Sequence, residues 1–237
     1  GSFAWSKSTT NSVYRTRESG VISDTNTKDD WAEGLPSHGQ WMDEGDGGVV
    51  AGPSGTMYAV ITEVAPNISG GDFVELFVTA ESTDVAGCMI YEGGTKIKTI
   101  PSDIGTLPKN MYIVLWASKG NNPVGTRGVD RDETAADENG NGYIDLYSDE
   151  SKPGLTGTDN TISLKTANDT LIDFMSFAEN DDTDFGSTLQ TVYNNAVTAG
   201  HWSPSATTEQ EYVDGSVAWS ESSSKSMYRI SQSAQPL

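Results

Sequence analysis

Residues 57–65 read MYAVITEVA and residues 72–79 read DFVELFVT, and these two segments decide the fold. Both are short, rich in β-branched and aromatic residues, and separated by a turn at 66–71, which is typical of strands. Alternate side chains of a strand point to opposite faces. The second segment therefore predicts two faces, one with Phe73, Glu75, Phe77 and Thr79 and the other with Val74, Leu76 and Val78.

More strand-like segments follow at short intervals. They are predicted at 84–91, 95–100, 111–117, 143–147, 161–165 and 170–177. The segment 111–117 is nearly all apolar, which favours a central strand, and 188–199 is predicted to be the one short helix. With 25 glycines and nine prolines to make turns, the sequence predicts an all-β protein built as a β-sandwich.

The charge of the chain limits its partners. It carries 34 acidic against 14 basic residues, a net charge of −20. This charge repels phosphate backbones and favours divalent cations, so we expect no nucleic-acid partner. No segment approaches the roughly 20 apolar residues of a membrane span, so we expect no membrane-spanning segment. Cys88 is the only cysteine, which excludes an internal disulfide.

One segment occurs twice. Residues 4–15 (AWSKSTTNSVYR, the N-terminal copy) and 218–229 (AWSESSSKSMYR, the C-terminal copy) are identical at seven of twelve positions without a gap. Each copy suits a strand. The two copies are interpreted as similar edge strands of one domain, as the tail of a preceding tandem domain, or as competitors for one position in the fold. In the last case one copy fills its own domain and the other a neighbour's.

The acidic, glycine-rich segment 43–55 is the best linker in the chain. We therefore predict an N-terminal, strand-bearing extension over residues 1–45 and a main domain over 46–237.

The main domain resembles the lamin tail domain family. The resemblance rests on VITEV at 60–64, DFVEL at 72–76, VAGCMI at 85–90, LID at 171–173 and SMYR at 226–229, in the order of that family's motifs. It implies an immunoglobulin-like β-sandwich. Such domains occur in nuclear lamins and in secreted bacterial and archaeal proteins, often beside hydrolases such as nucleases, where they are non-catalytic binding or structural modules.

The chain departs from that family's pattern at its ends. The loop and turn that usually follow the SMYR-like strand come instead after the N-terminal copy, at residues 24–31 and 35–39. Residues 3–40 therefore resemble the closing part of one lamin tail domain placed before another. This suggests a homo-oligomer or polymer joined through residues 3–40, with Trp5, Val13, Tyr14 and Arg15 as the assembly residues.

The strongest chemical motif is DENGNGYID at 137–145. Its oxygen-bearing side chains at loop positions 1, 3, 5 and 9 and its glycine at position 6 follow the calcium-loop template. The predicted Ca²⁺ ligands are Asp137, Asn139, Asn141, the Tyr143 carbonyl, Asp145 and Asp149. Position 12 is a serine rather than the usual glutamate, so Asp149, Glu150, Asp130 or Asp132 has to supply the missing carboxylate. The alternative is an acidic turn that leads into a strand.

No catalytic constellation is evident in the sequence. The two histidines, His38 and His201, show no metal-ligand spacing, and there is no nucleophile elbow or phosphate loop. We therefore expect no enzyme, but a calcium-stabilised structural module located outside the cell or on its surface, assembling as a filament or surface layer. The alternative is an adhesion or substrate-binding accessory domain of a larger secreted hydrolase or nuclease.

Overall fold

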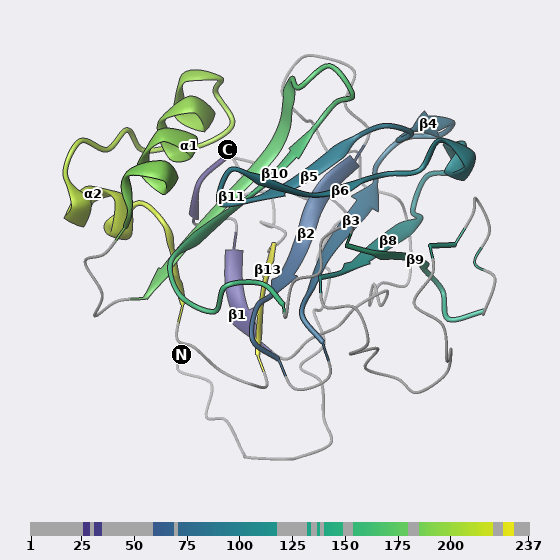
Figure 1. Cartoon of the computed structure of the whole chain (residues 1–237), viewed down its shortest axis with the longest axis horizontal. Helices are drawn as coiled ribbons and strands as arrows, with labels where there is room; N and C mark the ends of the chain where they lie inside the picture. The colour runs from purple at the N-terminus through teal and green to yellow at the C-terminus, as the bar shows by residue number, and fades with distance from the viewer. Residues whose placement is uncertain are drawn as a thin grey trace, which may run out of the picture.

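In the computed structural model, the part of the chain that the structure describes comprises residues 26–28, 31–34, 59–68, 71–117, 132–133, 137, 140–148, 154–179, 185–219 and 225–229. The protein is mainly β, with two mixed sheets and a few short helices (Figure 1).

The larger sheet has six strands. Its order is β1 (Trp31–Gly34), β13 (Ser226–Arg229), β2 (Ala59–Ala65), β3 (Phe73–Val78), β8 (Tyr112–Trp116) and β9 (Ile144–Tyr147). Neighbours are antiparallel except β8 and β9, which run parallel. The predicted strand at 111–117 is therefore confirmed in an interior position.

The second sheet has five strands. Its order is β12 (Val217–Trp219), β11 (Leu171–Glu179), β10 (Asn160–Lys165), β5 (Met89–Glu92) and β6 (Thr95–Thr99). Here β11 and β12 are the parallel pair. A small ladder of β4 (Thr83–Asp84) and β7 (Thr106–Leu107), with a 3-10 helix at Ser102–Ile104 before β7, completes the strands. The predicted strand at 84–91 is thus divided, because Gly87 takes a positive φ of 73° and turns the chain between β4 and β5.

The faces predicted for residues 72–79 are confirmed. Val74, Leu76 and Val78 belong to the main core, in which side chains from both sheets meet. Phe73 and Phe77 lie on the opposite face of the larger sheet, in a separate cluster of buried residues. This second cluster is aromatic: the Phe73 ring meets Trp116 edge to face, with ring centroids 5.4 Å apart. Strands β2, β3 and β8 of the larger sheet are thus buried on both faces, which explains why their sequences are so apolar.

Two helices lie beside β11 at one side of the molecule (Figure 1). The predicted helix at 188–199 is confirmed as α1 (Ser187–Thr198). It is not the only helix, because α2 (Glu209–Asp214) follows it. A capping box starts α2: the Thr208 side chain accepts a hydrogen bond from the Glu211 N–H, and the Glu211 carboxylate accepts bonds from Thr207 and Thr208, which lowers the pKa of Glu211.

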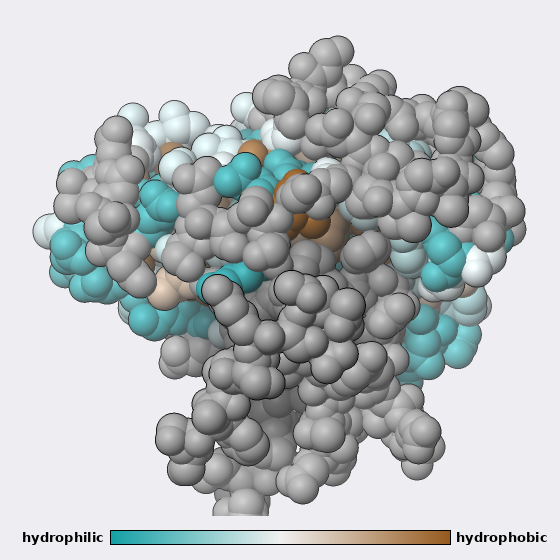
Figure 2. All heavy atoms as spheres, turned by 90° about the horizontal axis from the view of Figure 1, so that it is seen from below, coloured by the Kyte–Doolittle hydropathy of each residue, from teal (hydrophilic) through white to brown (hydrophobic). Residues whose placement is uncertain are grey.

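An aromatic cluster fixes the helices to the sheet. The Phe185 and Tyr212 rings stack with centroids 5.5 Å apart, and the Tyr193 ring stands perpendicular to both. Trp202 continues the cluster to Phe174 on β11. Such pairs add to the free energy gained by burial alone. On the face shown in Figure 2, the described residues are mostly hydrophilic, and the few hydrophobic ones are scattered, with the largest group near the centre.

Candidate functional site

The predicted calcium loop is a tight turn arranged around Asp137. One carboxylate oxygen of Asp137 accepts hydrogen bonds from the N–H groups of Gly140 (2.7 Å) and Asn141 (3.1 Å), and the other accepts one from Gly142 (2.7 Å). Both glycines have positive φ angles, 72° and 96°, a conformation that other residues adopt only with strain. The glycines at these positions are therefore required by the turn.

The loop is joined to the larger sheet through Asp145 on β9. The Asp145 carboxylate accepts hydrogen bonds from the Trp116 indole N–H and from the Asn141 amide. Two hydrogen bonds also join Asp145 and Glu133: the Glu133 N–H donates to the Asp145 carbonyl at 2.9 Å, and the Asp145 N–H donates to the Glu133 carboxylate. Asp145 is 2% exposed, so this end of the loop is held rigidly.

The donor chemistry of the loop fits Ca²⁺, which prefers carboxylate, amide and carbonyl oxygens. Asp137, Asn141 and Asp145 are brought into one hydrogen-bonded group, and Tyr143 lies between them in sequence. Asn141 has to turn its amide to offer its oxygen, since that oxygen accepts from the Tyr143 N–H. Among the described residues, no three acidic, histidine or cysteine side chains form a metal-binding group.

The structure describes only some of the other candidate ligands. Asn139 and Asp149 lie outside the described residues, as do Asp130 and Glu150. Asp132 points to other partners: its carboxylate forms an ion pair with Lys98 at 2.6 Å and accepts the Tyr147 N–H. Ser148, at loop position 12, donates its hydroxyl to the Ala117 carbonyl. Of the candidates for the missing carboxylate, Asp132 is thus engaged elsewhere.

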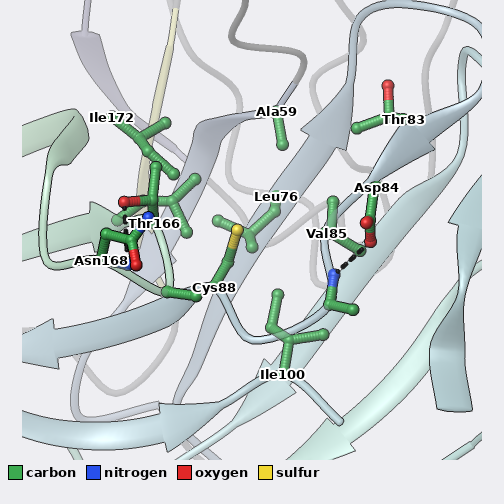
Figure 3. A pocket seen from close by; sticks show the side chains of 13 residues that line it. Ala59, Leu76, Thr83, Asp84, Val85, Cys88, Ile100, Thr166, Asn168 and Ile172 are labelled. Atoms are coloured by element: carbon green, nitrogen blue, oxygen red, sulfur yellow. Dashed lines mark hydrogen bonds between the residues drawn. The ribbon is translucent and has the colours of Figure 1, made fainter. Parts of the chain in front are cut away.

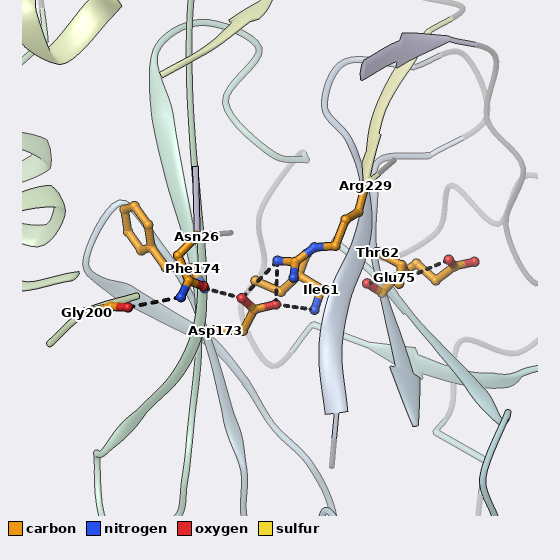
Figure 4. Close-up of polar contacts among 8 residues, drawn as sticks. All are labelled: Asn26, Ile61, Thr62, Glu75, Asp173, Phe174, Gly200 and Arg229. Atoms are coloured by element: carbon orange, nitrogen blue, oxygen red, sulfur yellow. Dashed lines mark hydrogen bonds and ion pairs between the residues drawn. The ribbon is translucent and has the colours of Figure 1, made fainter. Parts of the chain in front are cut away.

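A second candidate site lies between the two sheets, where the C-terminal copy is held. Arg229 on β13 and Asp173 on β11 form an ion pair across the interior, with one guanidinium nitrogen 2.9 and 3.0 Å from the two carboxylate oxygens (Figure 4). Both side chains are 2% exposed. Asp173 also accepts the N–H of Ile61 on β2 at 2.7 Å. One carboxylate therefore links β11 to two strands of the opposite sheet.

The other residues of β13 are equally well fixed. The Ser226 hydroxyl donates to the buried carboxylate of Glu63, and Met227 is fully buried in the main core. The Arg229 guanidinium also lies over the Trp31 ring of β1, 5.0 Å from its centre, a cation–π contact. We call the place between β1 and β2 that this strand fills the β13 position. It selects a serine, an apolar residue and an arginine in a fixed order.

The beginning of the C-terminal copy is held in the second sheet. Trp219 on β12 is 1% exposed, packs edge to face on Phe177 and donates its indole N–H to the Gly157 carbonyl at 2.8 Å. The neighbouring Ala218 is exposed. The C-terminal copy therefore contributes one strand to each sheet.

Part of the N-terminal extension completes this arrangement. β1 pairs antiparallel with β13, with Trp31 opposite Arg229 and Gly34 opposite Ser226. Just before it, the Asn26 amide donates to the Gly200 carbonyl, and Thr27 bridges to Ser203. The predicted assembly residues Trp5, Val13, Tyr14 and Arg15, the linker 43–55 and His38 lie outside the described residues.

The sequence does not predict Asp173, Glu63 and Trp31 as partners of the repeat. A signal was available for Asp173, because a carboxylate within the apolar strand 171–177 needs a buried partner. The matching arginine ends the C-terminal copy. No local feature connects the two, since they are 56 residues apart.

A pocket of about 230 Å³ opens at one end of the main core, beside Cys88 (Figure 3). Its wall is mostly apolar and includes Leu76, Val85 and Ile100, with Asp84 and Asn168 at its polar part. Burial, and to a smaller degree the charge of Asp84, raises the pKa of the Cys88 thiol to about 11. The thiol is therefore protonated at neutral pH and a weak nucleophile.

Fold and site together define a mainly β, two-sheet protein whose terminal segments meet at one edge of the larger sheet. The chain belongs to the family described as "protein second domain" (TP_1001_2nd), whose model matches residues 58–236. No curated protein matches the chain. The matched family is not the lamin tail domain family. The similarity of this chain to the lamin tail domain is therefore taken up as a proposal. Within the described part of the chain, no helix combines the length and the apolar character needed to cross a membrane.

Proposed function

We propose that this protein is a non-catalytic, calcium-stabilised structural module that acts outside the cell or on its surface and assembles through its N-terminal segment. We propose further that its two sheets form the immunoglobulin-like β-sandwich of the lamin tail domain. The strand order of the larger sheet, in which β13 and β2 are adjacent interior strands, supports this fold. The weakly nucleophilic thiol of Cys88 supports a role without catalysis.

One observation carries the assembly proposal: β1 is an added strand. It comes from the N-terminal extension, at the opposite end of the sequence from β13, and extends the larger sheet by pairing at its edge. Backbone hydrogen bonds and the Trp31–Arg229 contact hold it. A segment that docks by strand addition in its own domain has the chemistry to dock on another copy. A head-to-tail contact of this kind grows into a filament unless it closes into a ring.

Assembly is expected to depend on residues 1–25, which precede β1. Light scattering should give a mass that rises with the concentration of the full chain in the presence of Ca²⁺. A variant without residues 1–25 keeps Trp31 and should stay monomeric at every concentration. The matched control lacks residues 230–237 instead and should assemble like the full chain. A full chain that stays monomeric, or assembly that survives the N-terminal deletion, contradicts the proposal.

Calcium is proposed to bind at Asp137, Asn139, Asn141, the Tyr143 carbonyl and Asp145, with Asp149 as a further carboxylate. Because the ion binds the folded state, it should raise stability by mass action. With a dissociation constant of about 0.1 mM, typical of extracellular sites, about 10 mM Ca²⁺ is expected to add about 2.7 kcal/mol to the free energy of unfolding. Thermal unfolding in calcium and in chelator measures this difference.

The variant Asp137→Asn is expected to lose most of that calcium-dependent difference. Because Asp137 also organises the turn, the comparison is made within each variant, with and without calcium. Asp103→Asn changes an exposed carboxylate elsewhere and should keep the wild-type difference. Equal melting temperatures of the wild type in calcium and chelator would mean that the loop is an acidic turn and no more.

The second candidate function is that of a binding or adhesion domain of a larger secreted hydrolase. A pocket of about 340 Å³ between the five-stranded sheet and α1 favours it. Its wall combines the Tyr91 ring, which Lys165 covers at 4.5 Å from the ring centre, with polar groups of Asp169 and Asn195. An aromatic face beside polar groups is a common arrangement for small ligands. The assembly measurement above separates the two functions.

A further inference from the structure

We infer that Ser12–Arg15 is a second occupant of the β13 position, and that it fills this position in another copy of the chain. Phe3–Trp5 then takes the place of β12 in the same recipient. The inference rests on the proposed assembly and names its contact: the partner is a second copy of this chain, recognised through its Glu63 and Asp173.

The agreement between the two copies follows the contacts of the C-terminal copy. Ser226 and Arg229, whose side chains bind Glu63 and Asp173, correspond to identical residues, Ser12 and Arg15. The core residue Met227 corresponds to another apolar residue, valine. The N-terminal copy therefore carries each group that the β13 position selects.

The same holds for β12. Buried Trp219 corresponds to Trp5, and buried Val217 to the apolar Phe3. Exposed Lys225, in contrast, corresponds to an asparagine. The copies thus agree where the C-terminal copy is buried and differ at this exposed position. The exposed Ala218 also has an identical counterpart, Ala4, so agreement is not confined to contacts. The argument for a shared binding position therefore rests on Ser226, Arg229 and Trp219, whose contacts require these side chains.

The position of the N-terminal copy in the chain supports pairing with β1. Residues 16–30 connect Arg15 to Trp31, whereas Arg229 is at the other end of the sequence. Antiparallel pairing in the register of β1 and β13 places Arg15 opposite Trp31, and the short connection makes closing this hairpin entropically less costly. Residues 3–34 therefore form one unit that supplies β12, β13 and β1 equivalents together.

The sequence has two copies of the strand pair, and the described residues form one position for it, which the C-terminal copy fills. The glycine-rich residues 43–55 give the N-terminal unit reach beyond its own domain. A unit donated to the next chain leaves that chain's own N-terminal unit to be donated further. The exchange is therefore head-to-tail, and its product is a filament or ring of identical subunits.

Disulfide trapping between full-length chains tests the inference. Met227 lies opposite Val64 in the sheet, so Val13 of a donor chain should take the same place. Donor Val13→Cys and recipient Val64→Cys, both with Cys88→Ser, are refolded together from urea and oxidised. The 13–64 disulfide between chains is then identified by mass spectrometry. A single chain with Met227→Cys and Val64→Cys shows that the position itself forms the bond.

The expected result is a 13–64 disulfide whose yield rises several-fold when the recipient also carries Arg229→Met, which weakens its own β13. The yield should fall several-fold when the donor carries Arg15→Met. It should not change with donor Lys7→Glu, which introduces the residue of the C-terminal copy. If the Arg229→Met recipient does not refold, the unmodified recipient is compared with and without donor Arg15→Met.

The outcomes separate this inference from the proposed function. Assembly by light scattering without any 13–64 disulfide overturns the exchange and leaves the assembly proposal standing. A yield of the 13–64 disulfide that is unchanged by donor Arg15→Met also overturns the exchange, because the bond then does not depend on the contact with Asp173. An unmodified protein that stays monomeric overturns both, even if a dependent disulfide can be trapped, because exchange between chains must give an oligomer.

Discussion

Replacing Arg229 with methionine is expected to lower the free energy of unfolding by about 3–5 kcal/mol, the cost of breaking a buried ion pair. The substitution leaves the Asp173 carboxylate in the interior without the countercharge of Arg229, while the N–H groups of Ile61 and Phe174 still donate to it. It also removes the cation from the Trp31 ring. Urea unfolding, followed by tryptophan fluorescence, measures the difference from wild type.

The matched control is Lys165→Met. Lys165 pairs with Asp169 at 2.9 Å, the same distance as the buried pair, but its side chain is 25% exposed and that of Asp169 is 64% exposed. Exposed pairs contribute about 0–1 kcal/mol, because water screens them. A cost for Arg229→Met as small as that of Lys165→Met would show that Asp173 does not rely on Arg229 across the sheets.

A double variant tests the origin of the cost. In Asp173→Asn with Arg229→Met the uncompensated charge is gone, so stability should recover in part. Recovery should be incomplete, since Asp173 accepts backbone hydrogen bonds through both oxygens and asparagine has only one accepting oxygen. A double variant less stable than Arg229→Met alone would exclude the buried charge as the cause.

Trp219→Ala is expected to cost about 3–5 kcal/mol, as is usual when a large buried aromatic side chain is removed. The indole is almost fully buried against Phe177, and its N–H is the partner of the Gly157 carbonyl. Its loss leaves both a cavity and an unpaired carbonyl. Because β12 is an edge strand of three residues, Trp219 is one of its few buried anchors, together with Val217.

Two further substitutions in β12 serve as controls for the cost of Trp219→Ala. Trp219→Phe keeps part of the apolar contact but not the hydrogen bond, and should cost less than the alanine variant. Ala218→Ser alters an exposed residue of the same strand and should stay within about 0.5 kcal/mol of wild type. Near-native stability of Trp219→Ala in urea unfolding would mean that β12 does not depend on this anchor.

The candidate calcium loop was recognisable in the sequence because its information is local. Oxygen side chains and glycines at fixed offsets within nine residues are enough to predict a turn around Asp137, and the two positive φ angles confirm the need for Gly140 and Gly142. The capping box of α2 is also a local signal, with Thr208 three residues before Glu211, although no helix was predicted from it. The second helix was missed for that reason.

The sequence by itself determined where most strands lie and how the side chains of residues 72–79 divide between two faces, because strand periodicity and turn residues act over a few positions. The faces of residues 72–79 and the helix at 188–199 show this. Only the tertiary structure decided which strands are neighbours. The contacts between β1 and β13 and between Asp173 and Arg229 join residues that are far apart in the chain. Local sequence patterns do not identify such contacts. They form because a buried carboxylate requires a countercharge and a sheet edge requires a strand, and folding brings both within reach.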